Sequence, residues 1–153
     1  MKPRATGPKT PSGIAYLVGH LDRLVRRRLA ETISPLGLTI QQYTALAVLG
    51  ARGPLSNAQL AERSLVTPQS ANEMVKVMEK RGWIERSADP SHKRIILLHL
   101  THQGLEALKQ AHAAAAEFED TMLEGIVERD RQRFQNYLRA SVRALSQTSV
   151  EPI

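Results

Sequence analysis

The sequence has no cysteine among its 153 residues, which excludes disulfide bonds, thiolate metal sites and any peroxide sensing that depends on cysteine. It also has no apolar run close to the roughly 18 residues that a helix needs to span a bilayer. The N-terminal stretch lacks the hydrophobic segment of a signal peptide. We therefore expect a soluble protein that works in the cytoplasm.

Motifs of common catalytic sites are missing as well. There is no Gly-x-Ser-x-Gly elbow, no phosphate-binding glycine loop and no His-Glu-x-x-His pair, so we expect no enzyme, no cofactor and no metal site. Two of the five histidines, His99 and His102, flank an expected strand-to-helix junction, where imidazole could hold zinc with a nearby carboxylate. Surface histidines at such boundaries are commoner, so a zinc-dependent protein is kept only as an alternative.

The charge of the chain favours an anionic partner. The formal net charge is +6, which makes nucleic acid the first candidate and a membrane surface the second. The length and the 42% of hydrophobic residues suit a single domain over residues 13–147. Residues 1–12 carry Lys2, Arg4 and Lys9 without an apolar period, so we expect a disordered basic arm there and a frayed tail at 148–153.

Two helices are expected first. Between residues 13 and 34, apolar residues recur at spacings of three and four, and four arginines lie on the opposite side. Such a helix could lie on a membrane surface, but its long apolar stripe suits a helix packed within a domain. Pro35 ends it. Thr39 then caps a second helix, which stops at Arg52-Gly53-Pro54.

Local capping signals predict a helix-turn-helix. Ser56 precedes Gln59 by three residues, which is the spacing of a capping box and predicts a short helix. Thr67 comes next as an N-cap hydroxyl followed by proline at the first helical position. A second helix is therefore expected over residues 68–81, with Gly82 as its C-terminal stop.

The second of these helices has two different faces. At about 100° per residue its apolar side chains gather on one side and its polar ones on the other. The apolar set is Ala71, Met74, Val75 and Met78, and the polar set is Gln69, Asn72, Glu73 and Lys76, with Thr67 and Ser70 beside them. Such polar groups can meet base edges and phosphates when the start of the helix enters a major groove. An ordinary solvated face explains this one helix equally well.

A basic hairpin is expected after the helix-turn-helix. Residues 83–87 and 95–100 read as strands, joined by a turn that contains His92, Lys93 and Arg94. At a wing these three residues would lie over the sugar-phosphate backbone or in a narrow minor groove. A basic turn is often only a solubility feature, but its conjunction with the helix-turn-helix favours DNA. The order of elements predicts a mainly α fold with a small β-hairpin wing, a winged helix-turn-helix.

The C-terminal third is expected to be helical. Thr101 caps a long helix, a break is expected near Glu128 to Asp130, and a last helix follows. The helices at about 13–34 and 102–147 carry more apolar surface than a DNA-reading unit of about residues 55–101 needs. That excess predicts dimerisation through these terminal helices, with an intramolecular bundle as the alternative.

Six short motifs follow one another along the chain. They are Leu36-Gly37-Leu38-Thr39-x-x-Gln42, Leu60-Ala61, Thr67-Pro68-Gln69-Ser70, Met78-Glu79-x-x-Gly82-Trp83-Ile84-x-Arg86, Asp89-Pro90-x-x-Lys93-Arg94 and Leu98-x-Leu100-Thr101-x-x-Gly104. Together they resemble the MarR-type (multiple antibiotic resistance regulator) transcriptional regulators over about residues 13–147. Arg94 falls on the arginine position that is usual in the family's wing.

The resemblance implies homodimers whose terminal helices intertwine. It also implies an effector pocket between the first, second and fifth helices, where family members commonly bind aromatic acids or other phenolics. The residues that would face this pocket are Tyr16, His20, Arg23, Tyr43, Ala47 and His112. Their polar groups could fix one carboxylate or hydroxyl in an apolar slot, or they could equally be core residues with satisfied polar ends.

The sequence therefore predicts a homodimeric regulator that binds a roughly palindromic double-stranded DNA site, namely a repressor released by a small effector. The recognition-helix contacts would come from Thr67, Pro68, Gln69, Ser70, Asn72, Glu73 and Lys76, and the wing contacts from His92, Lys93 and Arg94. A winged-helix protein-interaction module is the alternative, in which the outer helix face would meet a protein.

Overall fold

The computed structural model describes residues 12–147. The expected basic arm, apart from Ser12, and the expected tail at 148–153 lie outside the described residues. The chain forms two compact units, of which the first ends at Phe118 and the second begins at Glu119.

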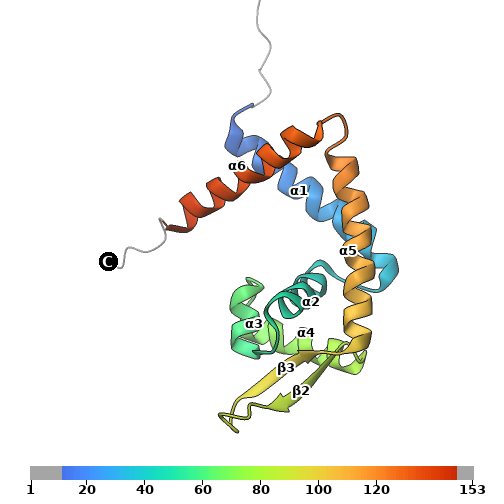
Figure 1. Cartoon of the computed structure of the whole chain (residues 1–153), viewed down its shortest axis with the longest axis vertical. Coiled ribbons are helices and arrows are strands. Elements are labelled where there is room, and N and C mark those ends of the chain that lie inside the picture. Colours follow the sequence, from blue (N-terminus) through green and yellow to red (C-terminus); the bar gives the residue numbers. More distant parts are fainter. Residues whose placement is uncertain (1–11, 148–153) are drawn as a thin grey trace, which may run out of the picture. The chain divides into compact units, whose positions relative to one another are not determined.

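Helices and one small sheet make up the first unit, and a hairpin projects from the helices (Figure 1). Its elements in chain order are α1 (Ile14–Ile33), the 3-10 turn η1 (Ser34–Leu36), α2 (Ile40–Arg52), β1 (Leu55–Ser56), α3 (Asn57–Arg63), α4 (Pro68–Lys80), β2 (Ile84–Ala88), β3 (Ile96–Leu100) and α5 (His102–Met122), which continues into the second unit. This order confirms the expected winged helix-turn-helix.

The helix starts are fixed by the expected caps. The Gln42 N–H donates to Thr39 Oγ1 at 3.2 Å, and Gln42 Oε1 accepts the Thr39 N–H at 3.0 Å. Ser56 and Gln59 make the same reciprocal pair at the start of α3. Each box satisfies two backbone donors that a helix start leaves open, and such a cap stabilises its helix by about 1 kcal/mol.

The sheet has three antiparallel strands in the order β1-β3-β2. Leu55 of β1 lies opposite Leu98 of β3, and Ile84 of β2 lies opposite Leu100. The sequence predicted only the hairpin of β2 and β3. The third strand was missed because β1 has two residues, too few to show an alternating pattern.

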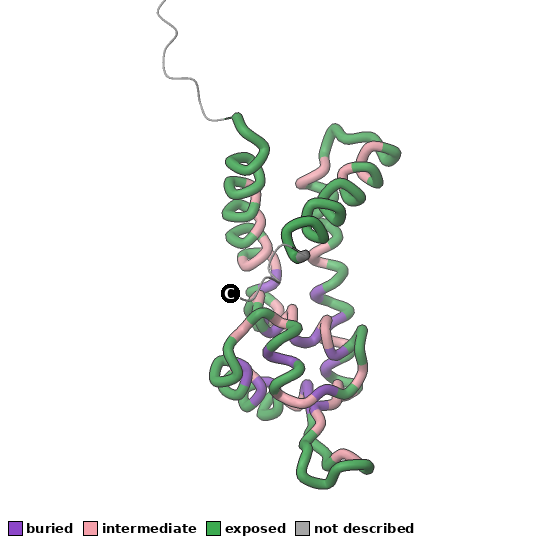
Figure 2. The backbone as a smooth tube through the Cα atoms, turned by 90° about the vertical axis from the view of Figure 1, so that its left-hand side faces the viewer, coloured by how far each residue is buried: buried purple, intermediate pink, exposed green. Residues whose placement is uncertain are grey.

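One core holds the helix-turn-helix and the wing strands together. Buried residues concentrate in α2, α3, α4 and the strands, whereas most of α1 is exposed or only partly buried (Figure 2). The largest fully buried side chains are Ile33, Leu46, Leu60, Met78, Ile84, Leu98 and Val75. Because α4 contributes Val75 and Met78 to this core, its opposite face is fixed outward.

The second unit consists of the end of α5, a turn and α6 (Glu128–Gln147). The break predicted at Glu128 to Asp130 is wrong, because these residues form the first turn of α6. The chain turns earlier, where Gly125 has a left-handed φ of 81°, a conformation that glycine adopts at little cost. Within residues 12–147, no helix combines the length and the apolar character needed to cross a membrane.

Candidate nucleic-acid interface

The outer face of α4 is polar and exposed along its length. Gln69, Asn72, Glu73 and Lys76 are all exposed. On the opposite side, Ala71, Val75 and Met78 have no exposed surface. The wheel drawn from the sequence is therefore confirmed, and the amides, the carboxylate and the ammonium are free to meet groups outside the protein.

The first turn of α4 is tied down by side-chain hydrogen bonds. The Ser70 N–H donates to Thr67 Oγ1 at 3.1 Å, and the Thr67 hydroxyl donates to Ser70 Oγ at 2.9 Å. Asn57, at the start of α3, donates from Nδ2 to the carbonyl oxygen of Pro68 at 3.3 Å. The start of the helix is thus held against α3. Sequence reasoning missed Asn57, because this contact joins residues eleven positions apart.

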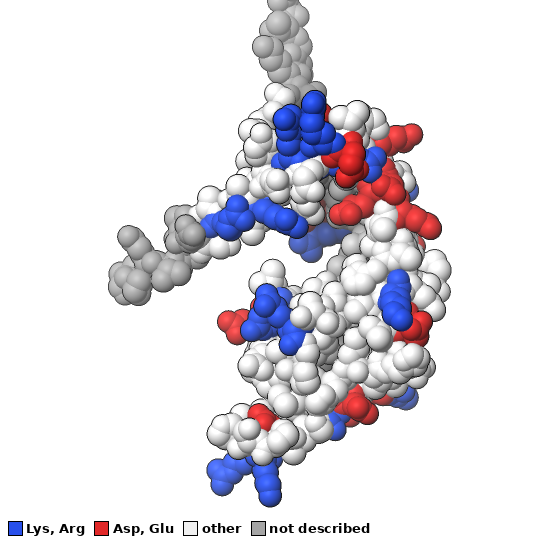
Figure 3. All heavy atoms as spheres, viewed as in Figure 1, with Lys and Arg blue, Asp and Glu red and all other residues white. Residues whose placement is uncertain are grey.

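The wing has a basic tip with a defined backbone. The Asp89 N–H donates to the carbonyl of Ile95 at 2.8 Å, and the Ile95 N–H donates to the carbonyl of His92 at 2.8 Å. The side chains of His92, Lys93 and Arg94 are exposed. Basic side chains project from the tip of this hairpin (Figure 3). The wing therefore presents positive charge at the end of a closed turn.

An ion pair connects the wing to α4. Arg86 of β2 donates from Nε to Glu79 Oε2 of α4 at 3.0 Å. Both side chains are partly exposed, so the pair contributes at most about 1 kcal/mol to stability. Its effect is on geometry, because it restricts movement of the wing strand relative to the helix that carries the polar face.

The residues expected at an effector pocket fall into separate groups. Tyr43 Oη lies 2.9 Å from His112 Nδ1, and the two rings meet edge to face with centroids 5.5 Å apart. On α1, the rings of Tyr16 and His20 are parallel at 6.2 Å, and Arg23 Nη2 lies 3.4 Å from His20 Nδ1. The hydrogen bond joins α2 to α5, whereas the three α1 residues contact one another.

A cavity of about 440 Å³ lies along α2. Its lining residues are Tyr43, Thr44, Ala47, Val48, Ala51, Arg52 and Arg63. Two of these, Tyr43 and Ala47, were expected at a pocket. Sequence reasoning missed Arg52 and Arg63, which come from α2 and α3 and meet only through the packing of these helices. An apolar floor with a phenol and two guanidinium groups suits a small aromatic anion.

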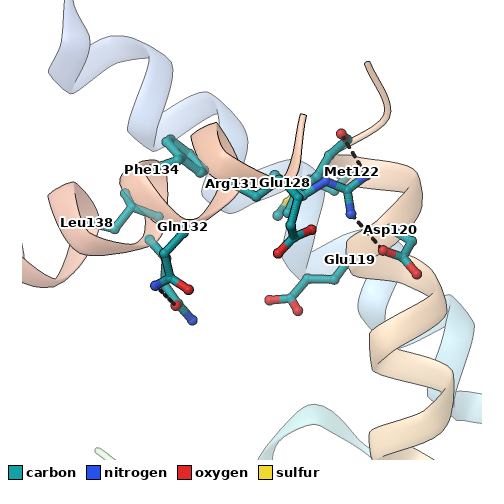
Figure 4. A pocket seen from close by; sticks show the side chains of 10 residues that line it. Glu119, Asp120, Met122, Glu128, Arg131, Gln132, Phe134 and Leu138 are labelled. Atoms are coloured by element: carbon teal, nitrogen blue, oxygen red, sulfur yellow. Dashed lines mark hydrogen bonds and ion pairs between the residues drawn. The ribbon is translucent and has the colours of Figure 1, made fainter. Parts of the chain in front are cut away.

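A second cavity, of about 290 Å³, lies within the second unit (Figure 4). Arg131 braces the turn beside it, with Nη1 2.8 Å from Asp120 Oδ1 and Nε donating to the carbonyl of Ile126 at 2.9 Å. Met122, Phe134 and Leu138 line the cavity. Charged and polar side chains, among them Glu119, Glu128 and Gln132, complete the lining, so the hollow is of mixed polarity.

The structure does not support a zinc site at His99 and His102. His99 Nε2 lies 2.5 Å from Ser87 Oγ across the wing strands, so this ring is engaged with a hydroxyl. Over the described range 12–147, no three histidine, aspartate or glutamate side chains gather closely enough to hold a metal ion.

Comparison with known proteins identifies the family. Residues 36–95 match the sequence model of the MarR family. The HTH-type transcriptional repressor Rv2887 of Mycobacterium tuberculosis is 33% identical over 100 residues, which cover 65% of this chain and 72% of that protein. The uncharacterized HTH-type transcriptional regulator YdcH of Bacillus subtilis is 30% identical over 137 residues, with 80% and 92% covered.

Solved structures agree with the sequence relatives. The structure of Rv2887 in complex with salicylic acid has a TM-score of 0.71 and 28% identity, covering 85% of this chain and 96% of that one. Wild-type MarR of E. coli has a TM-score of 0.74 at 22% identity, covering 87% and 98%, and this likeness concerns the fold alone. The chain belongs to the MarR family of winged helix-turn-helix transcriptional regulators.

Proposed function

We propose that the protein is a cytoplasmic repressor that binds a roughly palindromic DNA site as a homodimer and is released by a small aromatic acid. MarR-family proteins are transcriptional regulators and not enzymes. The observation that carries the proposal is the exposed polar face of α4 beside a wing with a basic tip, both in one unit and joined by the Glu79–Arg86 ion pair.

The contacts divide by chemistry into base readout and backbone positioning. Amides pair well with adenine and a carboxylate can accept from cytosine, so we assign Gln69, Asn72 and Glu73 to base edges together with Ser70, whose hydroxyl can turn from Thr67 to a base. Backbone positioning falls to Thr67, Pro68, Lys76, His92, Lys93 and Arg94. Cationic contacts to phosphate fix the register of a protein on DNA without reading sequence.

Dimerisation is supported by apolar side chains that the single chain leaves exposed. On α1 these are Ile14, Leu17 and Val18, and on α6 they are Tyr137, Leu138, Val142 and Leu145. Tyr137, Val142 and Leu145 are each at least 64% exposed, which is more apolar surface than one helix of a monomer usually shows to water. A second copy covering these faces would give a homodimer with two recognition helices. A palindromic site with half-sites about one helical turn apart requires these helices to lie roughly 34 Å from each other.

The cavity along α2 is the proposed effector site. The relative Rv2887 is solved with salicylic acid, and a volume of about 440 Å³ lies within the usual range for small-molecule pockets. The carboxylate of such an acid would pair with Arg52 or Arg63, and the ring would lie on Ala47 and Val48. Release of DNA follows if the ligand prefers a dimer geometry that cannot span two grooves.

Selection of binding sites from random duplex DNA tests the DNA part of the proposal. We expect a palindromic winner bound by two chains, with a large affinity gap over a scrambled duplex at two salt concentrations. If no site is enriched and only weak, salt-sensitive binding remains, the DNA-binding proposal fails. The α4 face would then be assigned to contact with another protein.

The effector part is tested with salicylate on the same complex. We expect salicylate to release the selected duplex from the wild type. Arg63→Met should raise the salicylate concentration that releases half of the duplex by about tenfold or more, because it removes one cation from the cavity. Arg139→Met, which removes an exposed cation from α6, serves as the matched control and should leave that concentration unchanged. Equal shifts in the two variants would exclude Arg63 from the effector site.

A further inference from the structure

The C-terminal end of α4 has a fixed geometry. The Trp83 N–H donates to the carbonyl of Met78 at 2.9 Å, and the Gly82 N–H donates to the carbonyl of Glu79 at 2.9 Å. With Gly82 left-handed at a φ of 72°, this is the Schellman pattern of a helix end. It brings the guanidinium carbon of Arg81 to 4.8 Å from the centroid of the Trp83 ring. Because Trp83 is 7% exposed, the ring is a firm support for the arginine.

From this support Arg81 reaches the turn that follows α1. Arg81 Nη1 donates to the carbonyl oxygen of Gly37 at 2.5 Å, across 44 residues of sequence. Gly37 caps η1 in the left-handed region, with a φ of 74°. A Cβ at position 37 would lie 2.8 Å from Arg81 Nη1, so the close approach depends on glycine. The hydrogen bond therefore joins the end of α4 to the turn that directly follows α1 and η1.

The turn is buried on one side and open on the other. Leu38 is 4% exposed and belongs to the core, and Leu36 packs against that core. Gly37 between them is exposed, and a surface cavity of about 220 Å³, lined in part by Leu36, Leu38 and Trp83, borders the turn. A charge-assisted hydrogen bond from a planar guanidinium therefore adds a directional restraint at the exposed Gly37 carbonyl.

We propose that Arg81 is a positioning residue for DNA binding, which sets the spacing between half-sites that the dimer accepts. The proposal rests on the function proposed above, in which α1 contributes to the dimer and α4 reads DNA. The bond from Arg81 to Gly37 fixes the angle between these two helices within one protomer. The two-fold axis of a dimer doubles any change in that angle, so the distance between the recognition helices depends on it. Arg81 is exposed, and its role is in orientation more than in fold stability.

The test compares three duplexes: the selected site, the same site with one base pair inserted between the half-sites, and the same site with one removed. One base pair changes the half-site separation by about 3.4 Å and rotates one half-site by about 34°. We expect the wild type to prefer the selected spacing strongly. Arg81→Met keeps the aliphatic stem and removes the hydrogen-bond donor. It should reduce the ratio of affinities between the selected duplex and the altered ones by about tenfold, equivalent to about 1.4 kcal/mol.

Lys80→Met is the matched control, because it removes the same charge from an exposed neighbour in the last turn of α4. It should lower affinity on all three duplexes alike and leave their ratio unchanged. Arg81→Lys retains the charge without the planar fork and should resemble Arg81→Met in the ratio. An unchanged ratio in Arg81→Met, with wild-type binding intact, would overturn the positioning role alone, whereas absence of site-specific binding by the wild type would overturn the proposed function.

A distance measurement covers the case in which Arg81→Met binds too weakly for a ratio. The chain has no cysteine, so a single Gln69→Cys substitution accepts one spin label per protomer on α4. Pulsed electron paramagnetic resonance on the DNA-free dimer then measures the distance between the two labels. We expect a broader distribution of this distance in the Arg81→Met background than in the wild-type or Lys80→Met background. Equal widths in all three would also overturn the proposal.

Discussion

Substitution of Gly104 by alanine should destabilise the protein by bringing a side chain against backbone. A Cβ at this position in the first turn of α5 would overlap the carbonyl oxygen of Trp83 and lie 2.8 Å from its carbonyl carbon. That carbonyl cannot move away freely, because it accepts the Thr101 N–H at 3.0 Å. Forcing a backbone shift in a packed region costs about 1–3 kcal/mol or more, and the gain in helix propensity from glycine to alanine is at most about 1 kcal/mol.

The expected net effect of Gly104→Ala is a loss of about 2 kcal/mol in the free energy of unfolding. For a chain of this length that lowers Tm by about 4–8 °C. Gly50→Ala is the matched control, since a Cβ within α2 would meet side-chain tips and no backbone: Leu108 Cδ2 at 2.8 Å and Leu100 Cδ2 at 3.8 Å. Because a leucine tip can shift and alanine favours the helix, its effect should stay within about 1 kcal/mol.

Urea and thermal unfolding at one fixed protein concentration measure both variants, since the stability of the proposed dimer would depend on concentration. A lower urea midpoint with an unchanged slope identifies a true loss of stability. If Gly104→Ala unfolds at the same midpoint as Gly50→Ala, the backbone overlap does not control stability and the reasoning fails.

Three further predictions concern α4, the wing and the turn before α4. Asn72→Ala should cost about 1–3 kcal/mol on the selected site and relax the preference at one base position; an equal loss on random duplex would argue against base readout. Arg94→Ala should weaken binding on most sequences and reduce the salt slope by about one, as measured by Kd over a salt series. Leu65 is 92% exposed with a φ of 56°, so Leu65→Asn should raise the free energy of unfolding by up to about 1 kcal/mol; an unchanged or lower urea midpoint would refute strain at this turn.

Local sequence predicted the helix starts because the responsible contacts are local. The capping boxes at Thr39 and Ser56 and the proline after Thr67 each act within three or four residues of sequence, and the structure confirms each helix start. The two-sided character of α4 follows from helical periodicity in the same way. Its DNA contacts themselves stay a prediction.

Features that depend on tertiary packing could not be derived in this way. β1 exists as a strand only because Leu55 pairs with Leu98, and two residues carry no periodic signal. The cavity along α2 includes Arg63 from α3, and no spacing in the sequence predicts that Arg63 lies beside the α2 residues. The bond between Arg81 and Gly37 spans 44 residues. Left-handed glycines can be suspected from sequence, yet nothing local indicated that the chain would turn at Gly125, just after α5, and not at residues 128–130.

The separation of the two faces of α4 has an evolutionary consequence. Among the hydrogen bonds and ion pairs observed within residues 12–147, none involves the side chains of Gln69, Asn72, Glu73 or Lys76, and these side chains are exposed. Substitutions at such positions usually alter stability by no more than about 0.5 kcal/mol. Because this face is the proposed DNA-reading surface, mutations there would change the DNA sequence that is read while the fold persists. Duplicated copies of the gene would then acquire different operators without first acquiring a more stable core.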